Sequence, residues 1–242
     1  MKSSKSPDRR PGPHETVDSL LDGRLKVIQP RDGYRFSVDA LLLAEFVTIR
    51  SGDFLVDLGT GCGVIPLILL LTTSLGHALG IEIQPDLAQR ASKNTMVNGL
   101  SRKMKTLLAD IRHPPLSPEI ADVVTCNPPY RKPESGRINP NTSRAIARHE
   151  ILVSLEDILA TARYLLKIKG RFTMVYPAER LIDLLSQSRR FNLEPKRLQV
   201  VYPDLHSSAK LVLVETVLEG NPGLEILPPI LGQGKYSLTA PV

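Results

Sequence analysis

Short apolar segments alternate along most of the chain with longer segments of helical periodicity. The pattern predicts strands at 54–57, 77–83, 105–109, 122–126 and 171–176, and helices at 64–73, 85–98, 155–168 and 179–190. Such an alternation is typical of parallel strands joined by helical crossovers. Two further strands, at 196–202 and 210–218, have no helical pattern between them, so we expect an antiparallel pair that closes the sheet.

The first 50 residues have a different pattern. Two short apolar stretches between residues 16 and 30 flank Asp22-Gly23, a hairpin signal. Ser37 is predicted to cap a helix over 38–46. Residues 1–14 are polar, rich in proline and basic, which favours disorder. We therefore expect a disordered basic tail (1–14), a hairpin and helix (15–50) and one α/β domain (51–242).

A glycine-rich loop follows the strand at 54–57. It begins with Asp57 and opens the next helix, and its glycines allow a tight turn and a close approach of the backbone to a ligand. These glycines are Gly59, Gly61 and Gly63. An aspartate beside such a loop disfavours a pyrophosphate and favours a cationic ligand, such as the aminocarboxypropyl sulfonium of S-adenosylmethionine.

Two further acidic residues end the next two predicted strands. Glu82 lies 19 residues after Gly63, where a carboxylate can accept hydrogen bonds from both ribose hydroxyls of a nucleoside cofactor. Asp110 follows the third strand and is expected to bind the adenine amino group. Together with the glycine loop, these acids predict a site for S-adenosylmethionine.

The tetrad Asn127-Pro128-Pro129-Tyr130 follows the strand at 122–126, at the edge where open α/β sheets bind ligands. Methyl transfer to nitrogen is an in-line displacement, so the nitrogen lone pair must point at the methyl group. The Asn127 side-chain carbonyl and the Pro128 backbone carbonyl can hold the two hydrogens of a planar amine or amide. The paired prolines stiffen the loop, and Tyr130 offers a flat face for stacking. The tetrad therefore predicts a nitrogen methyltransferase that acts by positioning, without a covalent intermediate.

Basic side chains are concentrated near this tetrad. The chain carries a net charge of +6, which favours a polyanionic partner. Residues 131–148 contain five basic side chains against the single acid Glu134, and we refer to them as the basic loop. They are Arg131, Lys132, Arg137, Arg144 and Arg148.

Other features of the composition argue against a disulfide-stabilised, zinc-binding, secreted or membrane-spanning protein. The two cysteines, Cys62 and Cys126, do not form a disulfide framework, and no ligand cluster has zinc spacing, so we expect reduced cysteines and no metal. The N-terminus lacks the apolar stretch of a signal peptide, and the apolar run at 64–71 is too short to span a membrane. We expect a cytoplasmic protein without a membrane partner.

The glycine loop and the Asn-Pro-Pro-Tyr tetrad together resemble the class I, Rossmann-like N-methyltransferases. The segment 29–44, from Gln29 to Ala44, resembles the N-terminal signature of tRNA N6-adenine methyltransferases that modify the anticodon loop of a valine tRNA. Shorter matches occur at 147–150, 169–172 and 234–237. This resemblance covers about residues 16–238, and the basic tail departs from it.

The resemblance implies a mostly parallel, seven-stranded sheet with an antiparallel edge strand, S-adenosylmethionine as cofactor and tRNA as substrate. It also implies that Arg35, Phe36 and Asp39 lie over the cofactor pocket as a lid. An RNA target agrees with the charge pattern, since an anticodon loop allows the adenine to unstack cheaply and the basic loop can follow the phosphates.

Three alternatives remain at this stage. The tetrad grips an amide as well as an adenine, so a protein glutamine N5-methyltransferase is one, although only about 50 residues precede the first strand of the main sheet. DNA adenine methylation is another, without a recognisable base-reading insert. The third is a non-catalytic module that binds RNA or the cofactor.

Overall fold

The alternating strands and helices form one mixed sheet beside an N-terminal hairpin. The computed structural model describes residues 11–32, 35–128 and 153–232. The strands in these ranges are β1 (Glu15–Leu20), β2 (Leu25–Pro30), β3 (Phe54–Leu58), β4 (His77–Glu82), β5 (Met104–Leu108), β6 (Ala121–Cys126), β7 (Leu166–Pro177), β8 (Leu193–Tyr202), β9 (Leu211–Leu218), β10 (Glu225–Ile226) and β11 (Ile230–Leu231). The helices are α1 (Val38–Phe46), α2 (Val64–Thr72), α3 (Pro85–Val97), α5 (Leu155–Leu165), the single-turn η1 (Ala178–Arg180) and α6 (Leu181–Arg190).

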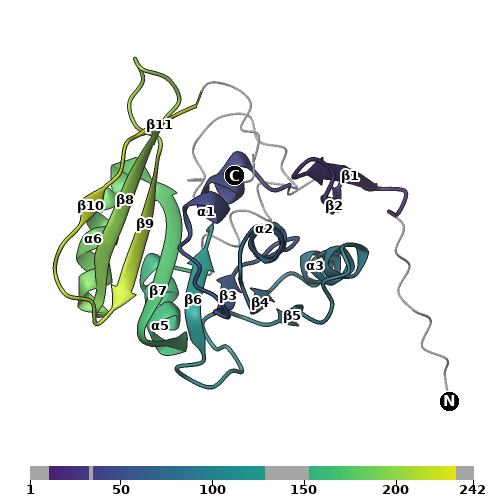
Figure 1. Cartoon of the computed structure of the whole chain (residues 1–242), viewed down its shortest axis with the longest axis horizontal. Coiled ribbons are helices and arrows are strands. Elements are labelled where there is room, and N and C mark those ends of the chain that lie inside the picture. The colour runs from purple at the N-terminus through teal and green to yellow at the C-terminus, as the bar shows by residue number, and fades with distance from the viewer. Residues whose placement is uncertain (1–10, 33–34, 129–152, 233–242) are drawn as a thin grey trace.

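The main sheet is mostly parallel, as the sequence predicts. Its nine strands run in the order β10-β8-β9-β7-β6-β3-β4-β5, and β11 also pairs with β8 (Figure 1). The neighbours from β7 to β5 are parallel, whereas β9 is antiparallel to both β7 and β8. The antiparallel strand β9 therefore lies between β7 and β8, inside the sheet, and does not form its edge. Seven long strands match the expected number, and the two-residue strands β10 and β11 extend the β8 edge.

Helices cover both faces of the sheet, and the sheet separates two apolar cores. In β3, Leu55 contacts the core under α1 and α2, while Val56 and Leu58 contact the core under α5 and α6. Consecutive strand residues point to opposite faces, so a parallel strand that is buried on both sides needs a continuous apolar run. Each such side chain contributes about 1.5–3 kcal/mol when fully buried.

The hairpin predicted around Asp22-Gly23 is confirmed. β1 and β2 pair antiparallel from Glu15↔Pro30 to Leu20↔Leu25. Leu21, Asp22 and Gly23 all have positive φ, at 54°, 53° and 88°, so the turn places two side-chain-bearing residues in the left-handed region. Figure 1 shows this hairpin above α3, beside the main sheet.

Helix ends are where the prediction differs from the structure. α1 begins after Ser37 as predicted, but the Ser37 side chain makes no cap hydrogen bond. The helix predicted over 155–168 ends at Leu165, and β7 begins at once with Leu166, which pairs with Ala121 before the register shifts. α5 begins with a capping box between Ser154 and Asp157.

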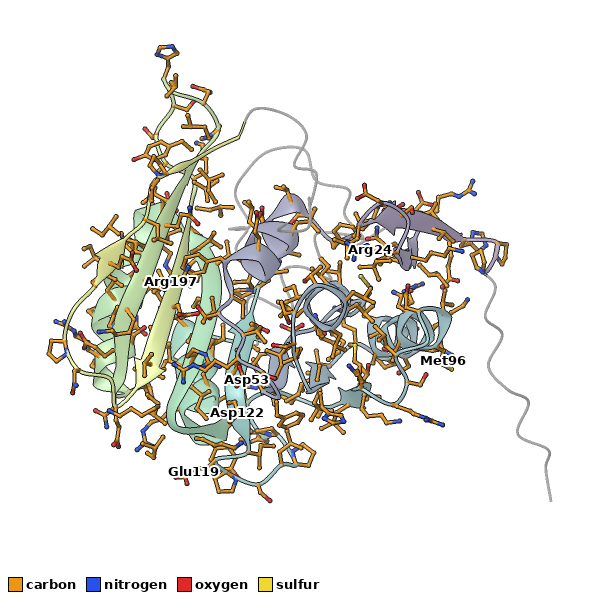
Figure 2. The ribbon with its side chains drawn as sticks, in the orientation of Figure 1. Arg24, Asp53, Met96, Glu119, Asp122 and Arg197 are labelled. Carbon is orange, nitrogen blue, oxygen red and sulfur yellow. The ribbon has the colours of Figure 1, made fainter. Side chains whose placement is uncertain are left out.

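Acidic residues hold the amino ends of the central strands (Figure 2). Asp53 forms a buried ion pair with Arg171 of β7, and Asp122 accepts a 2.9 Å hydrogen bond from the Phe54 backbone N–H. Asp122 also pairs with Lys167 at 2.7 Å, in a position that is largely exposed. These contacts link β3, β6 and β7 at the end of the sheet opposite the glycine loop.

Candidate cofactor and substrate site

The predicted site residues gather at the carboxyl ends of four adjacent strands. Asp57 and Glu82 lie at the ends of β3 and β4, and Asp110 and Asn127 follow the ends of β5 and β6. Since β6, β3, β4 and β5 are parallel neighbours, their carboxyl ends share one edge of the sheet. The sequence therefore locates these four side chains correctly at the edge where α/β sheets bind ligands.

The glycine loop after β3 uses its glycines in two ways. Gly59, Gly61 and Gly63 have φ of 67°, 58° and 83°, which side-chain-bearing residues rarely adopt. A Cβ added at Gly63 would lie 2.9 Å from Met104 Cε and 3.3 Å from Ala91 Cβ, whereas one at Gly59 would meet nothing within 4 Å. Gly63 thus lets α3 pack closely, and Gly59 leaves open space beside the loop.

Asp57 is buried at the start of this loop and incompletely hydrogen-bonded. Its Oδ1 accepts a 2.7 Å hydrogen bond from Thr125 Oγ1, its register partner on β6. Its Oδ2 has no hydrogen-bond partner, and neither has the buried Thr60 Oγ1. Burial raises the pKa of Asp57 to about 6, the Thr125 hydroxyl and the neighbouring Thr60 hydroxyl oppose the rise, and the nearby charge of Glu82 adds to it.

Glu82 fixes the loop to the next strand. Its Oε2 accepts from the Gly61 backbone N–H at 2.9 Å, and its Oε1 accepts from the Gln84 backbone N–H at 2.9 Å. The Thr60 N–H adds a 2.9 Å bond to the Ile81 carbonyl. Each carboxylate oxygen can accept more than one hydrogen bond, so the predicted ribose contact of Glu82 is compatible with this arrangement.

Asp110 already has a basic partner. Its carboxylate accepts from the Arg112 backbone N–H at 2.9 Å and from the Arg112 guanidinium at 2.5–3.1 Å. The Arg112 guanidinium holds the pKa of this carboxyl below its usual value. An adenine amino group would have to share these oxygens with Arg112, and the adenine contact stays a prediction.

Part of the predicted tetrad lies outside the described residues. Asn127 and Pro128 directly follow β6 and are half-buried. Pro129, Tyr130 and the basic loop 131–148 fall in the undescribed range 129–152. The β6 register places Cys126 beside Leu58, so Asn127 follows directly after the residues that face the start of the glycine loop.

Arg35 and Phe36 contact the hairpin. The Arg35 guanidinium pairs with Asp18 at 2.7 Å and donates to Thr16 Oγ1 at 2.6 Å. The Phe36 backbone N–H donates to Gln29 Oε1 at 2.8 Å, and its side chain packs partly buried against the α1–α2 core. Asp39 is half-buried in the first turn of α1. A lid role for Arg35, Phe36 and Asp39 stays a prediction.

Sequence reasoning missed three polar residues that organise the site. Thr125 orients Asp57, Gln29 ties Phe36 to the hairpin, and Asn94 donates a 2.9 Å hydrogen bond to the Cys62 carbonyl in the glycine loop. A signal for Asn94 does exist, because asparagine is a poor helix former that rarely occupies the buried face of a helix.

These residues fit a cationic nucleoside cofactor. Asp57 Oδ2 and Thr60 Oγ1 are buried oxygens without a hydrogen bond that an ammonium group can satisfy, and Gly59 of the same loop borders open space. Cys62 and Cys126 are buried free thiols, and burial raises the pKa of Cys62 to about 12, which agrees with a packing role. Among the described residues there is no group of three or more metal-ligating side chains, and no helix is long and apolar enough to cross a membrane.

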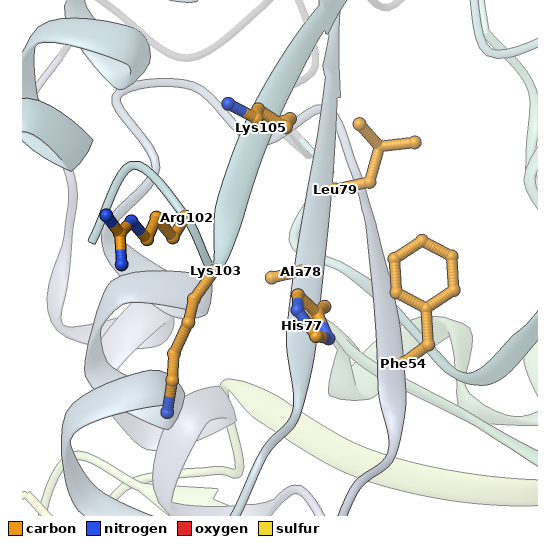
Figure 3. Close-up of a pocket in the computed structure, with 7 residues that line it drawn as sticks. All are labelled: Phe54, His77, Ala78, Leu79, Arg102, Lys103 and Lys105. Atoms are coloured by element: carbon orange, nitrogen blue, oxygen red, sulfur yellow. The ribbon is translucent and has the colours of Figure 1, made fainter.

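A separate hollow of about 330 Å³ lies at the other end of the sheet (Figure 3). It is lined by Phe54, His77, Ala78, Leu79, Arg102, Lys103 and Lys105. Phe54 and His77 begin β3 and β4, whereas the glycine loop and Glu82 lie at the opposite ends of these strands. This hollow is therefore distinct from the candidate cofactor site.

Similarity to known proteins agrees with this geometry. A family model described as a methyltransferase domain matches residues 49–218. The tRNA1(Val) (adenine(37)-N6)-methyltransferase of Porphyromonas gingivalis is 31% identical over 190 residues, covering 75% of this chain and 74% of the relative.

Solved structures show the same fold. A predicted O-methyltransferase from Agrobacterium tumefaciens has a TM-score of 0.65 at 18% identity, covering 83% of this chain and 91% of that one. The geranyl diphosphate C-methyltransferase of Streptomyces coelicolor, solved with S-adenosylhomocysteine, has a TM-score of 0.52 at 13% identity and covers 74% of this chain and 78% of that one. Fold, site geometry and sequence similarity agree, and the chain belongs to the methyltransferase-domain family.

Proposed function

We propose that this protein transfers a methyl group from S-adenosylmethionine to the exocyclic N6 of an adenine in RNA, with tRNA as the substrate. The observation that carries the proposal is the position of Asn127-Pro128 at the end of β6, beside the strand that leads into the glycine loop. The named activity of the relative from Porphyromonas gingivalis supports the same chemistry. A tRNA substrate favours a cytoplasmic location.

The cofactor would be held by the carboxylates at the sheet edge. Asp57 and Thr60 would accept hydrogen bonds from the ammonium group, Glu82 from the ribose hydroxyls and Asp110 from the adenine amino group. When bound, S-adenosylmethionine supplies an electrophilic methyl group on a sulfonium sulfur. The buried carboxylate of Asp57 would attract a cation more strongly than an exposed one, since little water screens its charge.

The substrate nitrogen would be held by the tetrad. The Asn127 and Pro128 carbonyls would accept the two amine hydrogens and aim the lone pair, while Tyr130 would stack on the base. The amine needs no base before attack, and the methylated nitrogen releases a proton to water afterwards. Catalysis of this kind relies on positioning and on electrostatic stabilisation of the developing charge on nitrogen.

The substrate is proposed to be single-stranded RNA because an adenine must leave its stack to reach such a site. The basic loop directly follows the tetrad in sequence, so its arginines would contact the phosphates beside the extruded base. Binding should therefore weaken as the salt concentration rises.

Substitution of Asn127 by alanine tests the division of roles. We expect methyl transfer to tRNA to fall by about 10²–10³-fold, the range for loss of a single group that stabilises transition-state charge. Binding of S-adenosylhomocysteine, measured by calorimetry, should stay within about twofold because Asn127 contacts the substrate nitrogen. Loss of cofactor binding in parallel with transfer would contradict these roles, and unchanged transfer would show that Asn127 does not position the substrate nitrogen.

A further inference from the structure

The N-terminal hairpin and the glycine loop are joined by one buried side chain of α3. Asn94 is completely buried. Its Oδ1 accepts from the Ile28 N–H at 2.7 Å, and its Nδ2 donates to the carbonyls of Ile28 at 3.0 Å and Cys62 at 2.9 Å. One amide group thus hydrogen-bonds β2 and the cofactor loop at the same time.

A second asparagine repeats half of this contact. Asn98 accepts from the Lys26 N–H at 2.9 Å and donates to the Lys26 carbonyl at 2.7 Å. Residues four apart on a helix are separated by about 6 Å along its axis, and residues two apart on a strand by about 6.8 Å. Asn94 and the C-cap residue Asn98 therefore match the outward-facing peptide groups of β2, and they satisfy an edge of the hairpin that would otherwise lack partners.

The same strand continues to the predicted lid. Gln29, next to Ile28, is buried, accepts from the Phe36 N–H at 2.8 Å and donates to Asp18, which in turn pairs with Arg35. A continuous set of hydrogen bonds thus leads from Cys62 through Asn94 and β2 to Phe36. α3 also touches the loop directly, since Ala91 closes the space beside Gly63.

We infer that Asn94 is a positioning residue that sets the glycine loop against the hairpin, so that cofactor binding and hairpin docking strengthen each other. The inference rests on the proposed cofactor role of the loop. Without the Asn94 amide, the Cys62 carbonyl is left without this donor, and the loop loses this hydrogen-bonded link to the hairpin. Coupling of this kind is reciprocal, because each binding event favours the arrangement that the other requires.

The matched variants Asn94→Ala and Asn98→Ala separate this role from hairpin docking alone. Both remove an amide that bonds β2, and only the first removes a bond to the loop. Asn98 is the C-cap residue of α3, and its replacement also removes a 2.8 Å bond to the Asn94 carbonyl. For Asn94→Ala we expect the KM for S-adenosylmethionine and the Kd for S-adenosylhomocysteine to rise about tenfold, with kcat within about twofold. Asn98→Ala should keep both constants within about twofold of the wild type.

Amide hydrogen exchange in the wild-type protein provides a second measurement that does not depend on any variant folding. Saturating S-adenosylhomocysteine should slow exchange of the Ile28 N–H more than that of the Lys26 N–H. Equal effects of the two substitutions on KM, or a loss of kcat with KM unchanged, would overturn the inference. An exchange rate of the Ile28 N–H that does not change when the ligand binds would also overturn it. A wild-type protein that binds no S-adenosylhomocysteine would instead refute the proposed function itself.

Discussion

At the scale of single residues, Asp57 lowers the stability of the ligand-free protein. A carboxylate that is fully buried with one unpaired oxygen would not be selected for stability. Its raised pKa of about 6 means that the folded protein holds the charged form less well than the unfolded chain does. A bound cation would supply the missing hydrogen-bond partner, so a bound ligand would offset the free-energy cost of burying this charge.

Replacing Asp57 by asparagine should therefore stabilise the free protein and impair cofactor binding. Relative to the ordinary value of 3.8, a folded pKa of about 6 destabilises the ionised fold by about 3 kcal/mol at pH 8. The stability present at low pH is lost as the pH rises from 3.8 through 6. Urea unfolding should show Asp57→Asn more stable by up to about 3 kcal/mol at pH 8 and by about half as much at pH 5.

Asp110 provides a control in which the Asp→Asn substitution should change the stability in the opposite direction. Its pKa is lowered by Arg112, so its charge favours the fold above the unfolded value, and Asp110→Asn should lose stability at pH 8. A variant at Asp57 that is less stable than the wild type at pH 8 would contradict the interpretation of its burial.

At the scale of elements, alanine substitutions at two glycines of one loop should differ in their effect on stability. Both Gly59→Ala and Gly63→Ala force a side chain into positive φ, which costs about 1 kcal/mol. At Gly63 the new methyl group would also collide with Met104 and Ala91, adding about 1–3 kcal/mol. Thermal unfolding should rank Gly63→Ala as clearly the less stable variant.

Gly59→Ala should weaken cofactor binding by more than its mild loss of stability would explain. Its methyl group enters the open space beside the loop, so the Kd for S-adenosylhomocysteine should rise although the fold is only mildly destabilised. The idea fails if Gly59→Ala binds the ligand as tightly as the wild type.

The elements themselves could largely be predicted from the sequence. β3, α2, β4 and α3 follow from apolar runs with glycine and proline at their ends, because these signals are local. The early end of α5 could not be foreseen, since Leu166 joins β7 through pairing with Ala121. Asn94 could not be assigned either, because its partners Ile28 and Cys62 are 66 and 32 residues away in the chain.

At the scale of the whole molecule, partly buried polar contacts join segments that are far apart in sequence. Arg197 of β8 lies 4.6 Å from the centre of the Phe46 ring and donates to Thr48 Oγ1 at 2.7 Å (Figure 2). Glu215 of β9 accepts from the Thr48 N–H at 3.0 Å. These contacts connect the end of α1 with β8 and β9 near one edge of the sheet, so α1 is integrated with the methyltransferase fold.

The ion pairs at the amino ends of the strands should differ in their contribution to stability. Arg171 and Asp53 are both buried, so Arg171→Met leaves an uncompensated carboxylate and should cost about 3–5 kcal/mol. Lys167 pairs with Asp122 in a largely exposed position, and Lys167→Met should cost under about 1 kcal/mol. Equal losses in urea unfolding would contradict the distinction, and neither change should alter cofactor affinity in the folded protein.

The activity proposed for this sheet edge is methylation of adenine in RNA. The most direct test incubates the purified protein with methyl-labelled S-adenosylmethionine and with RNA and protein fractions from a strain that lacks the enzyme. We expect label that ribonuclease releases, recovered as N6-methyladenosine from the tRNA pool. Label that only protease releases would contradict the claim and assign the protein to glutamine methylation. Measurable cofactor binding without any labelled product would contradict it in favour of a non-catalytic module.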